Sequence, residues 1–171
     1  MDWEDLRAYA KSQETLTPPG RTEESMTLYG DYKEWCSTQG LTNADYVKQY
    51  VEWCDESEIA FEPCLAPYHL SPKVQHWILW HHPDSIPGGS ILVPSKEIET
   101  VRSLLQSPGQ SMLLQNDEVI CFQNLPSIRS IPTIAHSHVF IRSATTALLG
   151  LLSRRRAAWL ARSPFLRIQK L

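Results

Sequence analysis

The chain has 171 residues, of which 42% are hydrophobic and 20% are charged. This balance is typical of one globular domain and excludes a wholly disordered, collagen-like or coiled-coil protein. The net charge of −3 is unevenly distributed, because residues 1–141 hold 9 basic and 19 acidic residues, whereas residues 142–171 hold 7 basic residues and no acidic one. An acidic body repels polyphosphate, so we expect no nucleic-acid binding by the main domain. No apolar run approaches the roughly 20 residues of a membrane-spanning segment.

The first sixty residues favour helices, because apolar residues recur there at helical spacing behind capping residues such as Asp2 and Thr22. In the second helix we expect an inner stripe of Met26, Tyr29, Tyr32 or Lys33, and Cys36. Three helices are predicted, over residues 3–12, 22–39 and 44–58.

The middle of the chain favours strands. Residues 61–72 hold three prolines and are predicted to form an irregular connection. Residues 73–80 are β-branched and aromatic and predict a strand. Two further strands are predicted over residues 118–125 and 136–142, and a helix over residues 96–106. Helices followed by a few strands with one inserted helix predict an α+β fold, in which N-terminal helices pack on a small, mainly antiparallel sheet.

We interpret residues 1–142 as a single domain and residues 143–171 as a basic C-terminal tail. As a helix from about residue 145 to 162, the tail would be amphipathic and basic, able to contact an anionic surface. Two alternatives stay open for it, a docked or surface-binding helix and an irregular, disordered segment.

Side chains that carry chemistry gather on the predicted strands. Alternation places His76, Trp80 and His82 on one face of the first strand, and His136 and His138 on one face of the last. If these faces adjoin in paired strands, cross-strand neighbours lie about 4.5–5.5 Å apart at Cβ. His76, His136 and His138 are then candidate zinc or iron ligands, or general bases in a metal-free pocket. The remaining alternative is that they are buried, hydrogen-bonded structural residues.

Two arginines are candidate anion-binding groups. Arg129 lies in the loop of residues 126–135, close to Asn124, where it can grip a phosphate or carboxylate. Arg21 precedes the second predicted helix and adds positive charge beside its N-terminal amides. Bridges from these arginines to some of the many acidic residues are the alternative. We take Arg129, Asn124, Arg21 and Trp80 as the candidate ligand-binding residues.

An ordered set of residues carries a family resemblance. It comprises Arg21, Tyr29, Trp35, Pro67-Tyr68, His76-Trp77, Trp80, Ser130-Ile131-Pro132, His136 and His138-Val139-Phe140. Over about residues 2–142 the chain resembles the N-acetylglucosamine-induced protein family, intracellular proteins of fungi and protists with one domain of unknown function. Leu125 departs from the family pattern, which often has proline there. The resemblance implies a link to amino-sugar response or metabolism, without a reaction or cofactor.

Two functions of different classes follow. The first is a binding protein without demonstrated catalysis, linked to N-acetylglucosamine response and taking a small anionic ligand such as an amino sugar or a phosphate. The second is a hydrolase or isomerase of a sugar phosphate that acts through the histidines, with or without a metal ion.

The sequence also favours a reducing compartment. The four cysteines, Cys36, Cys54, Cys64 and Cys121, have long spacings without CxxC pairs, so we expect thiols rather than disulfides. The N-terminus has no secretory signal pattern, and we expect a cytoplasmic protein. The ending Gln169-Lys170-Leu171 matches a peroxisomal address in its final two positions, which leaves a peroxisome-type organelle as the alternative.

Overall fold

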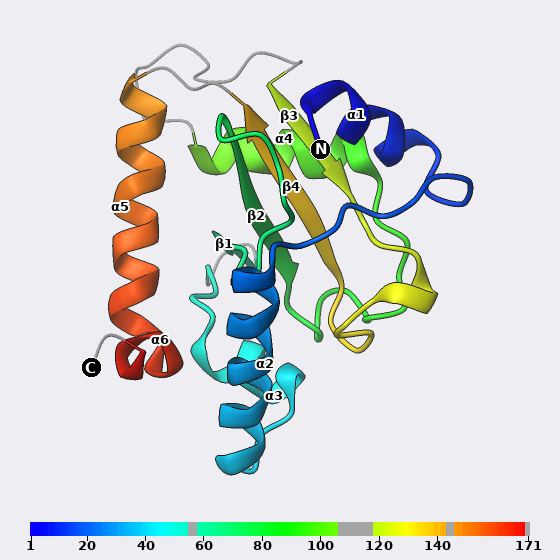
Figure 1. Ribbon diagram of the computed structural model, residues 1–171. Coiled ribbons are helices and arrows are strands. Elements are labelled where there is room, and N and C mark those ends of the chain that lie inside the picture. Colours follow the sequence, from blue (N-terminus) through cyan, green and yellow to red (C-terminus); the bar gives the residue numbers. More distant parts are fainter. Residues whose placement is uncertain (55–57, 106–117, 143–145, 170–171) are drawn as a thin grey trace.

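A computed structural model describes residues 1–54, 58–105, 118–142 and 146–169 (Figure 1). In these ranges four strands form one antiparallel sheet with the order β1-β2-β4-β3. The strands are β1 (Ile59–Pro63), β2 (Val74–His81), β3 (Val119–Phe122) and β4 (His136–Arg142). The helices are α1 (Trp3–Lys11), α2 (Glu23–Thr38), α3 (Asn43–Tyr50), α4 (Pro94–Leu105), α5 (Thr146–Arg162) and α6 (Pro164–Ile168), with a 3-10 turn at Pro126–Ile128. The predicted α+β class is confirmed.

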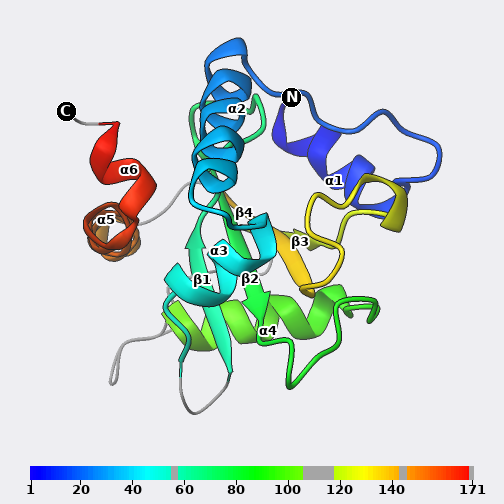
Figure 2. The same ribbon diagram turned by 90° about the horizontal axis from the view of Figure 1, so that it is seen from below.

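Helices cover both faces of the sheet. Figure 2 shows α4 on one side and α1, α2 and α3 on the other. On the α4 side, Trp77, Leu79 and Val139 form the largest core cluster together with Leu148 and Leu152 of α5. Strand alternation sends the intervening residues to the opposite face, where Phe122 and Phe140 pack with residues of α1. None of the described helices is long and apolar enough to cross a membrane.

A buried carboxylate fixes α4 to the sheet. Glu97 of α4 lies 2.9 Å from Nε2 of His81 on β2 and accepts a 2.8 Å hydrogen bond from the Ser137 hydroxyl on β4. All three residues are buried. A buried carboxylate needs such partners, since it has lost its water. The cluster therefore sets the position of α4 over two adjacent strands.

Caps explain where the N-terminal helices begin. The Asp2 side chain accepts backbone hydrogen bonds at the start of α1, and Thr22 does the same for α2. At α3, Thr42 forms a reciprocal capping box with Asp45. The predicted capping roles of Asp2 and Thr22 are confirmed.

Two local predictions were wrong, and a third was wrong at one residue. The third helix ends at Tyr50 and does not continue to residue 58. The segment that follows forms β1, which overlaps the predicted irregular connection, because all five of its residues are buried and pair with the free edge of β2. Pro63 stands last in this edge strand, where its missing N–H is tolerated. On α2 the inward face is also rotated, since Met26 is 53% exposed.

A close backbone approach supports the loops at the end of the sheet. A Cβ atom added to Gly88 would lie 2.2 Å from the Thr133 carbonyl carbon and 2.6 Å from the Pro132 oxygen. A Cβ atom at the neighbouring Gly89 would meet nothing within 4 Å. The loop that leads into β4 therefore needs a glycine at position 88.

We expect Gly88→Ala to destabilise the fold by about 1–3 kcal/mol, the usual cost of forcing extra volume into a filled space. Chemical denaturation measures this loss. Gly89→Ala is the matched control and should leave the free energy of unfolding nearly unchanged. Equal stability of the two variants would contradict the close approach.

Candidate functional site

The pairing of β2 with β4 brings the predicted histidines together. His76 is opposite Phe140, Ile78 is opposite His138, and Trp80 is opposite His136. Alternate residues share a face, so all these side chains point to the side of α2 and α3. The result is a 2.8 Å contact between Nε2 of His76 and Nδ1 of His138.

A backbone group determines the proton positions in this pair. The Tyr68 N–H donates to Nδ1 of His76 at 3.2 Å. Because an amide N–H can only donate, Nδ1 is the acceptor and the neutral His76 ring carries its proton on Nε2. His76 therefore donates to Nδ1 of His138, and His138 carries its proton on Nε2.

The side chain of Asn124 completes the chain of contacts. Its amide lies 2.9 Å from Nε2 of His138 and 3.2 Å from the Tyr68 hydroxyl. Nε2 of His138 is a donor and therefore needs an acceptor. We accordingly assign the Asn124 amide in the flipped orientation, with its oxygen facing Nε2 of His138. Asn124 thus fixes the orientation of the His138 ring.

His136 differs from the other two in having one ring nitrogen without a partner. Nδ1 lies 2.8 Å from the Ile134 carbonyl, which can only accept, so this nitrogen carries the proton. The unprotonated Nε2 has no hydrogen-bond partner among the described residues. Trp80 packs against the ring with centroids 4.8 Å apart. The arrangement holds a basic nitrogen in a fixed orientation.

Burial keeps all three rings neutral near pH 7. It lowers the pKa of His76 to about 3, with a smaller contribution from the positive charge of Arg21. Burial first, and then the neighbouring rings His76 and His136, lower the pKa of His138 well below its usual value. Burial also lowers the pKa of His136. Neutral imidazoles can accept protons or hydrogen bonds, whereas imidazolium ions cannot.

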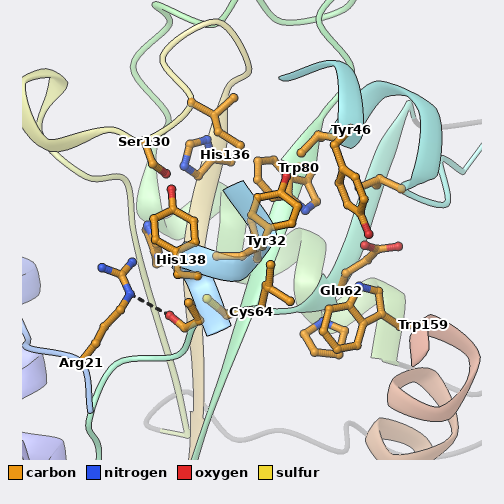
Figure 3. A pocket seen from close by; sticks show the side chains of 18 residues that line it. Arg21, Tyr32, Tyr46, Glu62, Cys64, Trp80, Ser130, His136, His138 and Trp159 are labelled. Atoms are coloured by element: carbon orange, nitrogen blue, oxygen red, sulfur yellow. Dashed lines mark hydrogen bonds between the residues drawn. The ribbon is translucent and has the colours of Figure 1, made fainter. Parts of the chain in front are cut away.

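A cavity of about 100 Å³ lies between this face of the sheet and the helices. The sheet contributes His136, His138 and Trp80, as Figure 3 shows. Such a volume holds several water molecules or part of a small ligand. Aromatic side chains from three helices form much of the remaining wall, namely Tyr29, Tyr32, Tyr46 and Trp159.

Arg21 supplies the positive charge of the cavity. Its Nε donates to the Ala66 carbonyl at 2.9 Å (Figure 3), and its guanidinium lies over the rings of Tyr68 and Tyr29, at 5.0 and 5.5 Å from the centroids. The terminal nitrogens have no carboxylate partner among the described residues. The guanidinium is therefore held in place while its outer donors stay available.

Trp80 lines the cavity as predicted for a ligand-binding residue, whereas Arg129, Asn124 and His82 lie outside it. Arg129 donates to the Asn124 carbonyl at 2.7 Å and to the Gly88 carbonyl at 3.3 Å, so it joins two loops. Asn124 lies behind His138. His82 comes after β2 and contacts Trp53 instead of the histidine group.

The geometry also bears on metal binding. The described residues contain no group of three histidine, cysteine, aspartate or glutamate side chains placed to hold a metal ion. Both ring nitrogens of His76 and of His138 already have partners. The metal interpretation stays a prediction, and we carry forward the metal-free pocket.

Sequence reasoning missed a carboxylate and an indole in the wall. Glu62 lies on β1 and Trp159 on α5, and both line the cavity. Glu62 carried a signal, since it stands alone between apolar residues in the segment from Ile59 to Pro63. No local pattern indicates Trp159. Cys64 also lines the cavity, and burial raises its pKa to about 12, so its thiol is not ionised at neutral pH.

The fold and this cavity define a small α+β protein with a face of buried histidines. Known proteins resemble it in sequence and in fold. Residues 2–142 match the family described as a protein of unknown function, DUF3605, and the chain belongs to this family. It is 26% identical to the uncharacterized protein YPL067C of Saccharomyces cerevisiae, over 81% of this chain and 77% of that protein. The crystal structure of a protein called HTC1 shares the fold with a TM-score of 0.63 and 23% identity, covering 90% of this chain and 96% of that chain.

The depressed histidine pKa values predict acid sensitivity. A ring whose pKa is lower when folded stabilises the protein fully above the unfolded value of about 6.5, and this contribution is lost as the pH falls toward the folded value. We expect the His76 ring, whose folded pKa of about 3 lies far below 5.5, to cost about 1.4 kcal/mol of stability at pH 5.5, and the His138 ring to add a cost of the same sign. Denaturation at pH 7.5 and 5.5 should show a smaller loss for His138→Asn than for the wild type.

The matched control is His69→Asn, because His69 is exposed and does not line the cavity. This control should follow the wild-type pH dependence. If His138→Asn and the wild type lost the same stability between the two pH values, the neutral state assigned to the buried ring would be wrong.

Proposed function

We propose that this protein binds a small anionic ligand in the cavity beneath α2, with Arg21 as the anion-binding group. The observation that carries the proposal is the guanidinium of Arg21, oriented by Ala66 and two tyrosine rings yet without a carboxylate partner among the described residues. In a body with 19 acidic residues before position 142, a preoriented arginine without a carboxylate partner among the described residues keeps its outer donors available for an anionic ligand.

The walls favour a ligand with a polar ring. Trp80 and Tyr32 offer aromatic faces, and Nε2 of His136 offers a hydrogen-bond acceptor for a hydroxyl group. A phosphorylated sugar combines an anion, a compact ring and hydroxyl donors. The resemblance to the N-acetylglucosamine-induced proteins supports an amino sugar within this class, and we propose a role in amino-sugar response or metabolism.

The test is binding of inorganic phosphate and glucose 6-phosphate by calorimetry. We expect Arg21→Met to weaken binding of both about 10- to 100-fold, the usual effect of losing a charge-assisted hydrogen bond. Arg7→Met is the control, because Arg7 is on α1 and does not line this cavity. Equal affinities of Arg21→Met and the wild type would refute the proposal.

A second function, hydrolysis or isomerisation of a sugar phosphate, is favoured by the fixed tautomer of His136. The Ile134 carbonyl holds the proton on Nδ1 and leaves Nε2 free to act as a general base. His76 and His138 act in this reading as positioning residues, because their ring nitrogens are occupied.

We expect His136→Gln to abolish turnover of a sugar phosphate while phosphate affinity stays within a few-fold of the wild type. Paired turnover and calorimetric measurements make the comparison. A variant that kept its turnover would exclude the catalytic role, and a protein without turnover of any sugar phosphate would leave ligand binding as the function.

The location and the tail belong to the same proposal. A cytoplasmic protein agrees with four cysteines that form no disulfide. The exposed Arg154 and Arg156 of α5 are the groups available for contact with an anionic surface.

A further inference from the structure

A buried carboxylate lies on the side of the cavity opposite Arg21 (Figure 3). Glu62 is only 6% exposed and lines the cavity. Its Oε1 accepts a hydrogen bond from the Glu52 N–H at 3.1 Å and a second one from Nη2 of Arg162. Its Oε2 has no hydrogen-bond partner among the described residues. Glu62 thus keeps one acceptor available at the wall.

The protein compensates the burial of Glu62 only in part, since burial raises the pKa of this carboxyl despite its contact with Arg162. Arg162 is shared, because its Nη1 also lies 2.6 Å from Oε2 of Glu52. One guanidinium therefore contacts two carboxylates, of which Glu52 also interacts electrostatically with Arg155. Water solvates Glu52, whose side chain is 70% exposed, whereas the buried Glu62 has little contact with water. A buried charge is stabilised by a partner of opposite sign.

One end of the cavity offers a positive group to a ligand, and the other end offers a carboxylate. Arg21 has no carboxylate partner among the described residues. Glu62 shares the Arg162 guanidinium with Glu52, and its Oε2 has no hydrogen-bond donor in the same described ranges. Between them stand aromatic side chains, including Tyr32, Tyr46 and Trp80, which can cover the body of a ligand but cannot neutralise charge. The complementary ligand carries a negative group at one end and a positive group at the other.

Building on the proposed function, we propose that the cavity selects a zwitterionic ligand whose anionic group meets Arg21 and whose ammonium group donates to Oε2 of Glu62. A hexosamine phosphate with a free amine has this chemistry. A sugar phosphate with a hydroxyl in place of the amine retains the anion and lacks the cation, and an acetylated amine also lacks it.

Helix α5 participates in this selection. Arg162 of α5 holds Oε1 of Glu62 and so directs Oε2 toward the cavity, which makes it a positioning residue. Trp159, one turn earlier on α5, lines the same wall. Both residues lie beyond residue 142, outside the part of the chain that matches the DUF3605 family.

The test compares ligands that differ in one group. Calorimetry at neutral pH measures the affinities of glucosamine 6-phosphate, glucose 6-phosphate and inorganic phosphate for the wild type, Glu62→Gln and Glu99→Gln. In the wild type we expect glucosamine 6-phosphate to bind at least about tenfold more tightly than glucose 6-phosphate, the effect of one charge-assisted hydrogen bond. Glu62→Gln should reduce this ratio to near one while phosphate affinity is retained.

Glu99→Gln is the matched control, since Glu99 is exposed on α4 and does not line this cavity, and it should keep the ratio. Equal wild-type affinities for the two sugar phosphates, both lost in Arg21→Met, would overturn this inference and leave the proposed function intact. Absence of binding by any of the three probes would overturn both. A ratio that survives in Glu62→Gln would overturn the assignment to Glu62, and the wild-type comparison decides the ligand class even if that variant is unstable.

Discussion

The register of the β2–β4 pair is the constraint on which the rest of the molecule depends. With Ile78 opposite His138, the imidazoles and Trp80 share one face of the sheet, and Trp77 and Val139 share the other. A slip by one residue exchanges the two faces of a strand. It would turn His138 toward the apolar core beneath α4. Core packing and site geometry therefore select the same register, because the large apolar side chains on the far face hold the histidines in place.

Within that register, the direction of the hydrogen bonds distinguishes three chemically similar rings. The Tyr68 N–H donates to His76 and starts a sequence of donors that occupies both nitrogens of His76 and His138. The Ile134 carbonyl orients His136 in the opposite sense and leaves its Nε2 available. Burial keeps the rings neutral, so the site offers one acceptor of known position beside one fixed cation. Structural and chemical roles are thus divided among histidines that look equivalent in the sequence.

Local patterns predicted the features that depend on neighbouring residues. Alternation was sufficient for β2 and β4 and for the shared face of His76 and His138, because a strand repeats every two residues. It failed at β1, where a proline-rich stretch becomes a strand only through pairing with the edge of β2. The two arginines show the same limit. Both Arg21 and Arg129 suited an anion, and only the tertiary contacts reveal that loop carbonyls occupy Arg129.

The cavity joins two parts of the chain with different anchors. Its histidine face belongs to the sheet, whereas Trp159 lies on α5. At one end, Leu148 and Leu152 fix α5 in the main core. At the other end α5 is followed by α6, where Phe165 packs against Tyr32. Packing at both ends holds this helix beside β1, so Arg162 reaches Glu62 without being part of the domain that the family match defines. The proposed anion binding at Arg21 depends on residues of that domain alone. The proposed recognition at Glu62 depends also on the basic helix α5, because its Arg162 contacts Oε1 of the buried carboxylate and leaves Oε2 without a donor among the described residues.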